Sequence, residues 1–165
     1  GRVAQLARAN INALLDSAED PELMLDQMVR DYTSNIAEAE QAIAQTIGNL
    51  RMLEEDYAED QQAAVEWGRK ALAASQKADE FRAGGNVGDA EKFDHLAKVA
   101  LGRQMSAENE ARSAEPNIAA QREVVEKLKS GLQAMKDKLG QLTSKRDELI
   151  AMMSSPLAPG SRVPR

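Results

Sequence analysis

The stretch FRAGGNVGDA, residues 81–90, decides the fold because it separates two long apolar seams. On either side of it, apolar residues recur in alternating steps of three and four, over residues 25–81 and again over residues 93–153. A stripe this narrow and this long is typical of a coiled-coil seam rather than of a helix on a globular core. Gly84-Gly85-Asn86 tolerates positive φ and can end the first helix. The pattern therefore predicts an all-α fold, a long antiparallel helical hairpin (a coiled coil) with the form of a rod.

The residues of the two seams are those expected to hold the helices together. Folding the chain about residues 84–86 brings Trp67 near Gln104. Alanine and polar residues gather near this corner, whereas the far end carries Leu, Ile and Met, so the far end buries more apolar area and is expected to be more stable. The predicted hairpin-packing residues are Ile36, Ile43, Leu50, Leu53, Trp67, Leu128, Leu132, Leu139 and Leu142.

The chain is predicted to divide into three parts. A short amphipathic helix precedes the hairpin, and an irregular tail or a leftover of cloning follows it. The bounds are 1–18 for the amphipathic helix, which is partial, 21–153 for the hairpin, with helices 21–83 and 87–153 and the turn 84–86, and 154–165 for the tail.

Local signals support these helix ends. Asp20 is a good N-cap, and Pro21 suits the first helical position, where its missing N–H costs nothing. Asp89 is the predicted cap of the second long helix, and Gly88 is expected to keep the corner loose. Pro116 lies inside that helix and removes one backbone hydrogen bond. Both a tolerated kink and a hinge between two rigid segments are compatible with it.

Composition narrows the class of protein. The formal net charge is −6, and 29% of the residues are charged, with both signs interspersed. This describes solvated helix faces and argues against a nucleic-acid partner. The chain has no cysteine, which excludes disulfides and thiol chemistry. No apolar run approaches the roughly 20 residues of a membrane span. We expect a protein that is soluble or at most lies on a membrane.

The sequence contains no set of residues that indicates catalysis. His95 is the only histidine, so neither a histidine-based metal site nor a catalytic triad can be assembled. The carboxylates of residues 54–60 are spread around a helix, and residues 84–88 lack the Lys-Ser/Thr of a phosphate loop. We therefore expect no catalytic, cofactor-binding or metal-binding residues, no cofactor, and no enzymatic activity.

The first 18 residues are the candidate membrane-facing element. Apolar residues gather on one side of this segment and two arginines lie beside them, as in helices that lie in a membrane interface. The predicted membrane-binding residues are Arg2, Val3, Leu6, Arg8, Ile11, Leu14 and Leu15. An equally open alternative is that this helix docks on the hairpin or on a neighbouring copy.

Three stretches resemble one protein family. They are ANINALLDSAEDPE (residues 9–22), AVEWGRKA (residues 64–71) and EVVEKLK (residues 123–129). They are similar to phage shock protein A and to its relative, the vesicle-inducing protein in plastids, over roughly residues 1–153. The first stretch is the specific one, since long coiled coils match many unrelated helices. The resemblance implies a fragment of an ESCRT-III-like protein, truncated at both ends.

The resemblance also implies a function. Such proteins are peripheral membrane-stress proteins of the bacterial cytoplasm, on the inner face of the inner membrane. They polymerise as homo-oligomers on anionic membrane surfaces, which they remodel or protect, and some hold an AAA+ transcription activator inactive. The alternative from the residues alone is a structural coiled-coil interaction protein without a membrane role.

Overall fold

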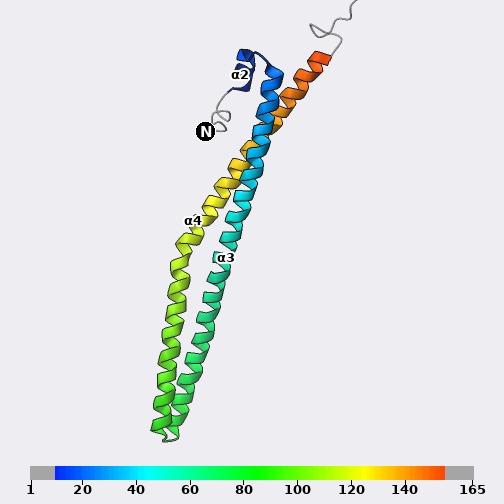
Figure 1. Ribbon diagram of the computed structural model, residues 1–165. Helices are drawn as coiled ribbons and strands as arrows, with labels where there is room; N and C mark the ends of the chain where they lie inside the picture. Colours follow the sequence, from blue (N-terminus) through cyan, green and yellow to red (C-terminus); the bar gives the residue numbers. More distant parts are fainter. Residues whose placement is uncertain (1–9, 155–165) are drawn as a thin grey trace, which may run out of the picture. The chain divides into compact units, whose positions relative to one another are not determined.

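Three helices make up the part of the chain that the structure, a computed structural model, describes, residues 10–154. They are α2 (Ile11–Ser17), α3 (Pro21–Ala83) and α4 (Val87–Ser154), shown in Figure 1. The two long helices pack against each other and form a hairpin, preceded by the short helix α2. The predicted all-α fold class is therefore confirmed.

The start of α3 follows the capping rule. The Asp20 Oδ1 accepts a hydrogen bond from the backbone N–H of Leu23 at 3.1 Å, and Pro21 is the first helical residue. This side-chain acceptor satisfies one of the N–H groups that the first turn leaves without a partner. The predicted role of Asp20 as N-cap is confirmed.

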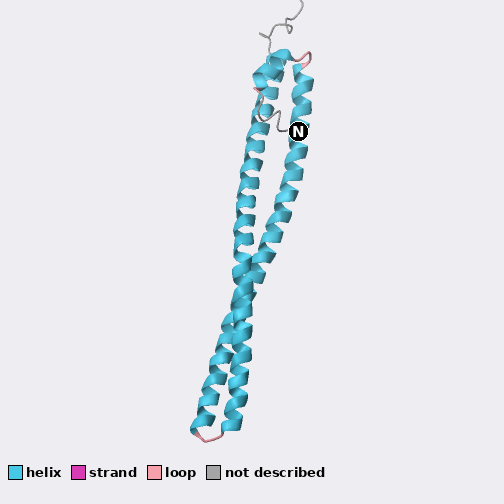
Figure 2. Cartoon of the chain, turned by 90° about the vertical axis from the view of Figure 1, so that its left-hand side faces the viewer, coloured by secondary structure: helices cyan, strands magenta, loops and turns pink. Residues whose placement is uncertain are grey.

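The turn between α3 and α4, drawn as the pink loop at the foot of Figure 2, closes in a Schellman-type arrangement. The N–H of Asn86 donates to the carbonyl of Phe81 at 2.8 Å, and the N–H of Gly85 donates to that of Arg82 at 3.1 Å. Gly85 has φ of 78°, a left-handed conformation that glycine adopts without a Cβ clash. The glycine at this position therefore ends α3.

Asn86, not Asp89, caps α4. The Asn86 Oδ1 accepts from the Asp89 backbone N–H at 3.2 Å, while the Asn86 Nδ2 donates to the Asp89 carboxylate at 2.7 Å. The prediction for Asp89 was wrong because the helix begins one residue after Asn86, which leaves Asp89 in the first turn. Gly88 lies inside α4 as well.

Side-chain contacts between the two long helices hold the hairpin corner together. The rings of Phe81 and Phe93 stack with centroids 5.5 Å apart. The Arg82 guanidinium lies 2.6 Å from the Asp94 carboxylate and 2.7 Å from that of Asp79. These contacts join the end of α3 to the start of α4, so the expectation of a loose corner is corrected.

The chain divides into two compact units with different cores. The first comprises residues 10–45 and 125–154 of the described chain, and the second is Thr46–Val124. Large side chains dominate the buried set of the first unit: Leu25, Met28, Tyr32, Ile36, Ile43, Val125 and Leu142. Small ones dominate that of the second: Leu50, Ala64, Ala71, Ala78, Ala90, Ala97, Ala100, Ala111 and Ile118. Alanine allows close approach but buries little area, as the sequence predicts for the part near the corner.

Candidate functional site

The apolar side of α2 packs against the long helices within the first unit. The Asn10 Oδ1 caps the helix by accepting from the Asn12 N–H at 2.9 Å. Ile11, Leu14 and Leu15 pack against a cluster that we call the base cluster, consisting of Leu25, Met28, Tyr32 and Leu142, which are between 0% and 5% exposed. No residue of α2 is itself fully buried. Its apolar side chains are therefore shared between the base cluster and solvent.

Tyr32 places a hydroxyl inside this apolar cluster. The side chain is fully buried, and among the described residues the hydroxyl has no hydrogen-bond partner. Burial raises the pKa of the Tyr32 hydroxyl, because the charged phenolate would lose its hydration. A buried hydroxyl without a hydrogen-bond partner lowers the stability of the folded state, because its lost hydration is not replaced.

The structure brings together only part of the predicted membrane-binding set. Ile11, Leu14 and Leu15 lie on one side of α2, and that side faces the base cluster. Arg2, Val3, Leu6 and Arg8 lie outside the described residues. Of the two alternatives open from the sequence, docking on the hairpin is the arrangement found for residues 11–15.

The predicted packing residues differ in how far they are buried. Ile36, Ile43, Leu50 and Leu142 are buried, whereas Leu53, Trp67, Leu132 and Leu139 are half-buried. Leu128, at 37% exposed, is the most exposed of the set. Two helices leave the flanks of their seam without a third element to cover them, so a leucine at the edge stays open to water.

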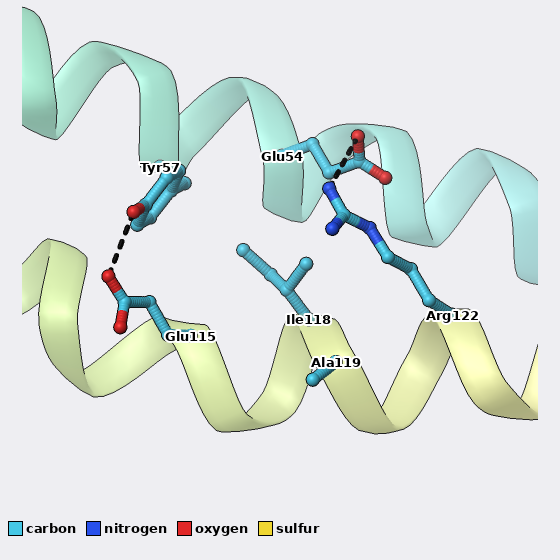
Figure 3. A pocket seen from close by; sticks show the side chains of 6 residues that line it. All are labelled: Glu54, Tyr57, Glu115, Ile118, Ala119 and Arg122. Atoms are coloured by element: carbon cyan, nitrogen blue, oxygen red, sulfur yellow. Dashed lines mark hydrogen bonds and ion pairs between the residues drawn. The ribbon is translucent and has the colours of Figure 1, made fainter.

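A shallow groove in the second unit is lined by polar side chains of both long helices, and its volume is about 250 Å³. Figure 3 shows Glu54 and Tyr57 of α3 facing Glu115, Ile118, Ala119 and Arg122 of α4. The Tyr57 hydroxyl donates to the Glu115 Oε1 at 2.9 Å, and the Arg122 Nη2 lies 3.5 Å from the Glu54 Oε2. The hydrogen bond to Glu115 raises the pKa of the Tyr57 hydroxyl. The four polar groups form these two pairs, and each pair links α3 to α4. The groove contains no nucleophile beside a general base that could activate it.

Two cationic side chains contact the ring of Trp67 in the second unit. The Lys70 Nζ lies 4.5 Å from the ring centroid, and the Arg103 Cζ lies 5.1 Å from it. Such contacts are attractive because the ring face carries negative potential. The i, i+3 spacing to Lys70 is visible in the sequence, but the contact with Arg103 depends on how the helices align across the turn.

The described residues 10–154 form neither a metal site nor a membrane span. Within that range, no group of three or more His, Asp or Glu side chains is placed to hold a metal ion. None of the described helices is long and apolar enough to cross a bilayer.

Comparison with known proteins gives matches along most of the chain. The sequence profile described as the PspA/IM30 family matches residues 1–158. The rice membrane-associated protein VIPP1, chloroplastic, is 32% identical over 154 residues, which cover 93% of this chain and 44% of the rice protein. The membrane-associated protein Vipp1 of Synechocystis is 31% identical over 91% of this chain and 51% of its own length. The phage shock protein A homolog of Bacillus subtilis is 32% identical over 67% of this chain and 49% of its own length. The chain thus spans about half the length of these relatives.

Proposed function

Because the chain belongs to the PspA/IM30 family, a non-catalytic structural family, we propose that it is a membrane-associated scaffold of the membrane-stress response. The scaffold polymerises on the bacterial inner membrane and remodels or protects it. Its partners are other copies of itself and an anionic membrane surface, on the cytoplasmic side. The names of the rice and Synechocystis relatives, which call them membrane-associated, support this proposal. The predicted absence of enzymatic activity is confirmed by the family.

The observation that carries the proposal is the incomplete burial of the apolar side of α2. Its apolar side chains are half-buried on the base cluster, so the same side can exchange that contact for a membrane interface. A short interfacial helix binds through its apolar area and through attraction to anionic lipids. Because seven residues bury little area, one copy binds weakly, and polymerisation supplies avidity.

Flotation with anionic vesicles tests the role of α2. The chain is compared with Leu14→Glu, which places a charge on the apolar side, and with Ala13→Glu, which places the same charge on the exposed side of the same helix. We expect Leu14→Glu to lower binding at least about tenfold, because burial of a leucine contributes about 1.5–3 kcal/mol. Ala13→Glu should bind nearly as the parent does, and circular dichroism checks that all three proteins remain helical.

Two results would contradict this proposal. Failure of the parent chain to float would favour a structural coiled-coil protein without a membrane role. Equal flotation of the parent and both variants would show that α2 does not contact the membrane.

A second proposal is that the hairpin also holds an AAA+ transcription activator inactive. Exposed apolar side chains of the second unit support it, since Leu72 is 60% and Met105 61% exposed. Co-purification with such an activator tests it, and Leu72→Asp should weaken the contact. Co-purification of Leu72→Asp at the parent level would contradict the assignment of this surface.

A further inference from the structure

Three of the seven methionines gather at the base cluster, and the other four are exposed. Met28 belongs to the cluster and is 5% exposed, whereas Met24 and Met135 are half-buried and pack against it. The four exposed methionines, between 56% and 64% open to solvent, are Met52, Met105, Met152 and Met153. Met24 and Met135 are thus the two that combine partial access to solvent with a place in the packing of a core.

A half-buried thioether is open to attack by peroxides, which convert methionine to its sulfoxide. With hydrogen peroxide, a lone pair of the sulfur attacks one oxygen, and the S–O bond forms as the O–O bond breaks. The hydroxide that leaves takes the proton of the transferred oxygen and becomes water. The sulfur is oxidised by two electrons and the peroxide is reduced, so hydrogen peroxide is the only co-reactant required. The product is a polar and chiral side chain in place of an apolar one.

A sulfoxide oxygen at Met24 or Met135 is poorly accommodated by the base cluster. The oxygen is a hydrogen-bond acceptor, and the two leucines and Met28 of the cluster have no side-chain donor to offer it. The fourth member, Tyr32, has a hydroxyl without a partner among the described residues, but it is fully buried and can serve one sulfoxide at most. The sulfoxide reaches water only when the cluster opens, so oxidation favours a less tightly packed cluster.

The helix α2 is the element that such a loosening releases first. It has seven residues, none of them fully buried, and a helix of that length is not stable in water by itself. The long helices α3 and α4, of 63 and 68 residues, are held by the rest of their seam as well. Met24 also lies where the chain from α2 enters α3, since its N–H donates to the Asp20 carbonyl at 3.1 Å. The contact of Ile11, Leu14 and Leu15 with the base cluster is therefore the most sensitive to a sulfoxide.

We propose that Met24 and Met135 are a peroxide-sensitive modification site whose oxidation releases α2 from the base cluster. Methionine sulfoxide reductases return the sulfoxides to thioethers, so the release is reversible. Its consequence for the membrane rests on the proposed function, because the apolar side of α2 that leaves the cluster is the side proposed to bind the bilayer. Exposure to peroxide then raises membrane binding.

Peptide mass spectrometry after graded exposure to hydrogen peroxide tests the site itself. The four exposed methionines should be oxidised first, Met24 and Met135 next, and Met28 last. Hydrogen exchange of residues 11–17 should then be about fivefold faster than in the untreated protein, which corresponds to about 1 kcal/mol, and the reductases should restore the original rate. Oxidation of Met24 and Met135 no faster than that of Met28 would overturn the proposal. Unchanged or slower exchange of α2 would overturn it too, since slower exchange would mean that the Tyr32 hydroxyl binds the sulfoxide.

Paired substitutions separate these two methionines from the others. Met24→Leu with Met135→Leu keeps apolar side chains of similar volume without the sulfur, so peroxide should leave the exchange of α2 unchanged. Met24→Gln with Met135→Gln places a polar oxygen near the position of a sulfoxide oxygen and should speed that exchange without peroxide. Met52→Gln with Met105→Gln is the matched control at exposed positions and should have no effect. An equal response of the leucine variant and the parent to peroxide, or equal effects of the two glutamine variants, would refute the assignment, and circular dichroism confirms that each variant is folded.

Flotation with vesicles that contain phosphatidylglycerol, an anionic lipid, tests the consequence separately. The oxidised parent should bind about fivefold more than the untreated protein, and the oxidised leucine variant should bind as it does before treatment. Hydrogen exchange needs no membrane, so a failure of the modification site and a failure of membrane binding give different results. Faster exchange without any gain in flotation would support the modification site and contradict the membrane role of α2, whereas unchanged exchange would overturn the modification site alone.

Discussion

Replacing Tyr32 by phenylalanine should stabilise the protein. The hydroxyl is buried in the base cluster without a hydrogen-bond partner among the described residues, whereas the ring packs with Leu25, Met28 and Leu142. Tyr32→Phe keeps the ring and removes the oxygen alone. A buried polar group without a partner costs about 1–3 kcal/mol, so we expect the free energy of unfolding to rise by about 1 kcal/mol.

The assay is urea unfolding followed by circular dichroism, with thermal unfolding alongside. For a chain of this size, a gain of about 1 kcal/mol raises Tm by roughly 2–4 °C. Tyr57→Phe is the matched control, because the Tyr57 hydroxyl is bonded to the Glu115 carboxylate at 2.9 Å. It should be neutral or slightly destabilised. A loss of stability in Tyr32→Phe beyond about 0.5 kcal/mol would refute the reasoning, since it would mean that the hydroxyl has a partner.

The same hydroxyl predicts a dependence of stability on pH. Burial raises the pKa of Tyr32 in the folded state above the ordinary value of 10.0. Below about pH 10 the hydroxyl is protonated in both states, so its contribution does not change with pH. Above that value the unfolded chain loses the proton first, and the free energy of unfolding falls. Tyr32→Phe should lose less stability than the parent over that range, and parallel curves for the two proteins would contradict the assignment.

Two further substitutions test the core and the turn. Leu142→Ala should lower the free energy of unfolding by about 2–5 kcal/mol because Leu142 is fully buried, whereas Met152→Ala at a 56% exposed position should stay within about 0.5 kcal/mol in the same urea assay. Gly85→Ala should destabilise by about 1–2 kcal/mol because φ is 78°, while Gly84→Ala, whose Cβ would meet its nearest atoms at an ordinary 3.6 Å, should be tolerated. Equal Tm values for the two glycine variants would contradict the assigned turn geometry.

Features of the fold that have a local physical cause could be predicted from the sequence. The apolar period, the cap at Asp20 and the glycines of the turn each act within a few residues, and together they predict a helical hairpin. Features could not be predicted where two neighbouring residues suit the same role, or where contacts with distant residues set the exposure of a side chain. Asn86 and Asp89 are both good caps, and the backbone of the turn selects Asn86. Leu128 has the right spacing for the seam, but how much of it stays exposed, 37%, depends on the neighbouring side chains.

The sequence by itself determined the helices, the reversal at residues 84–86 and the membership of the family, because helical period, turn chemistry and family similarity are all written along the chain. Only the tertiary structure decided that α2 rests on the base cluster, that the Tyr32 hydroxyl is buried without a described partner, and that Arg103 joins Lys70 over Trp67. Each of these depends on distances between residues far apart in sequence. An apolar helix side is compatible with membrane or hairpin until packing places a partner against it.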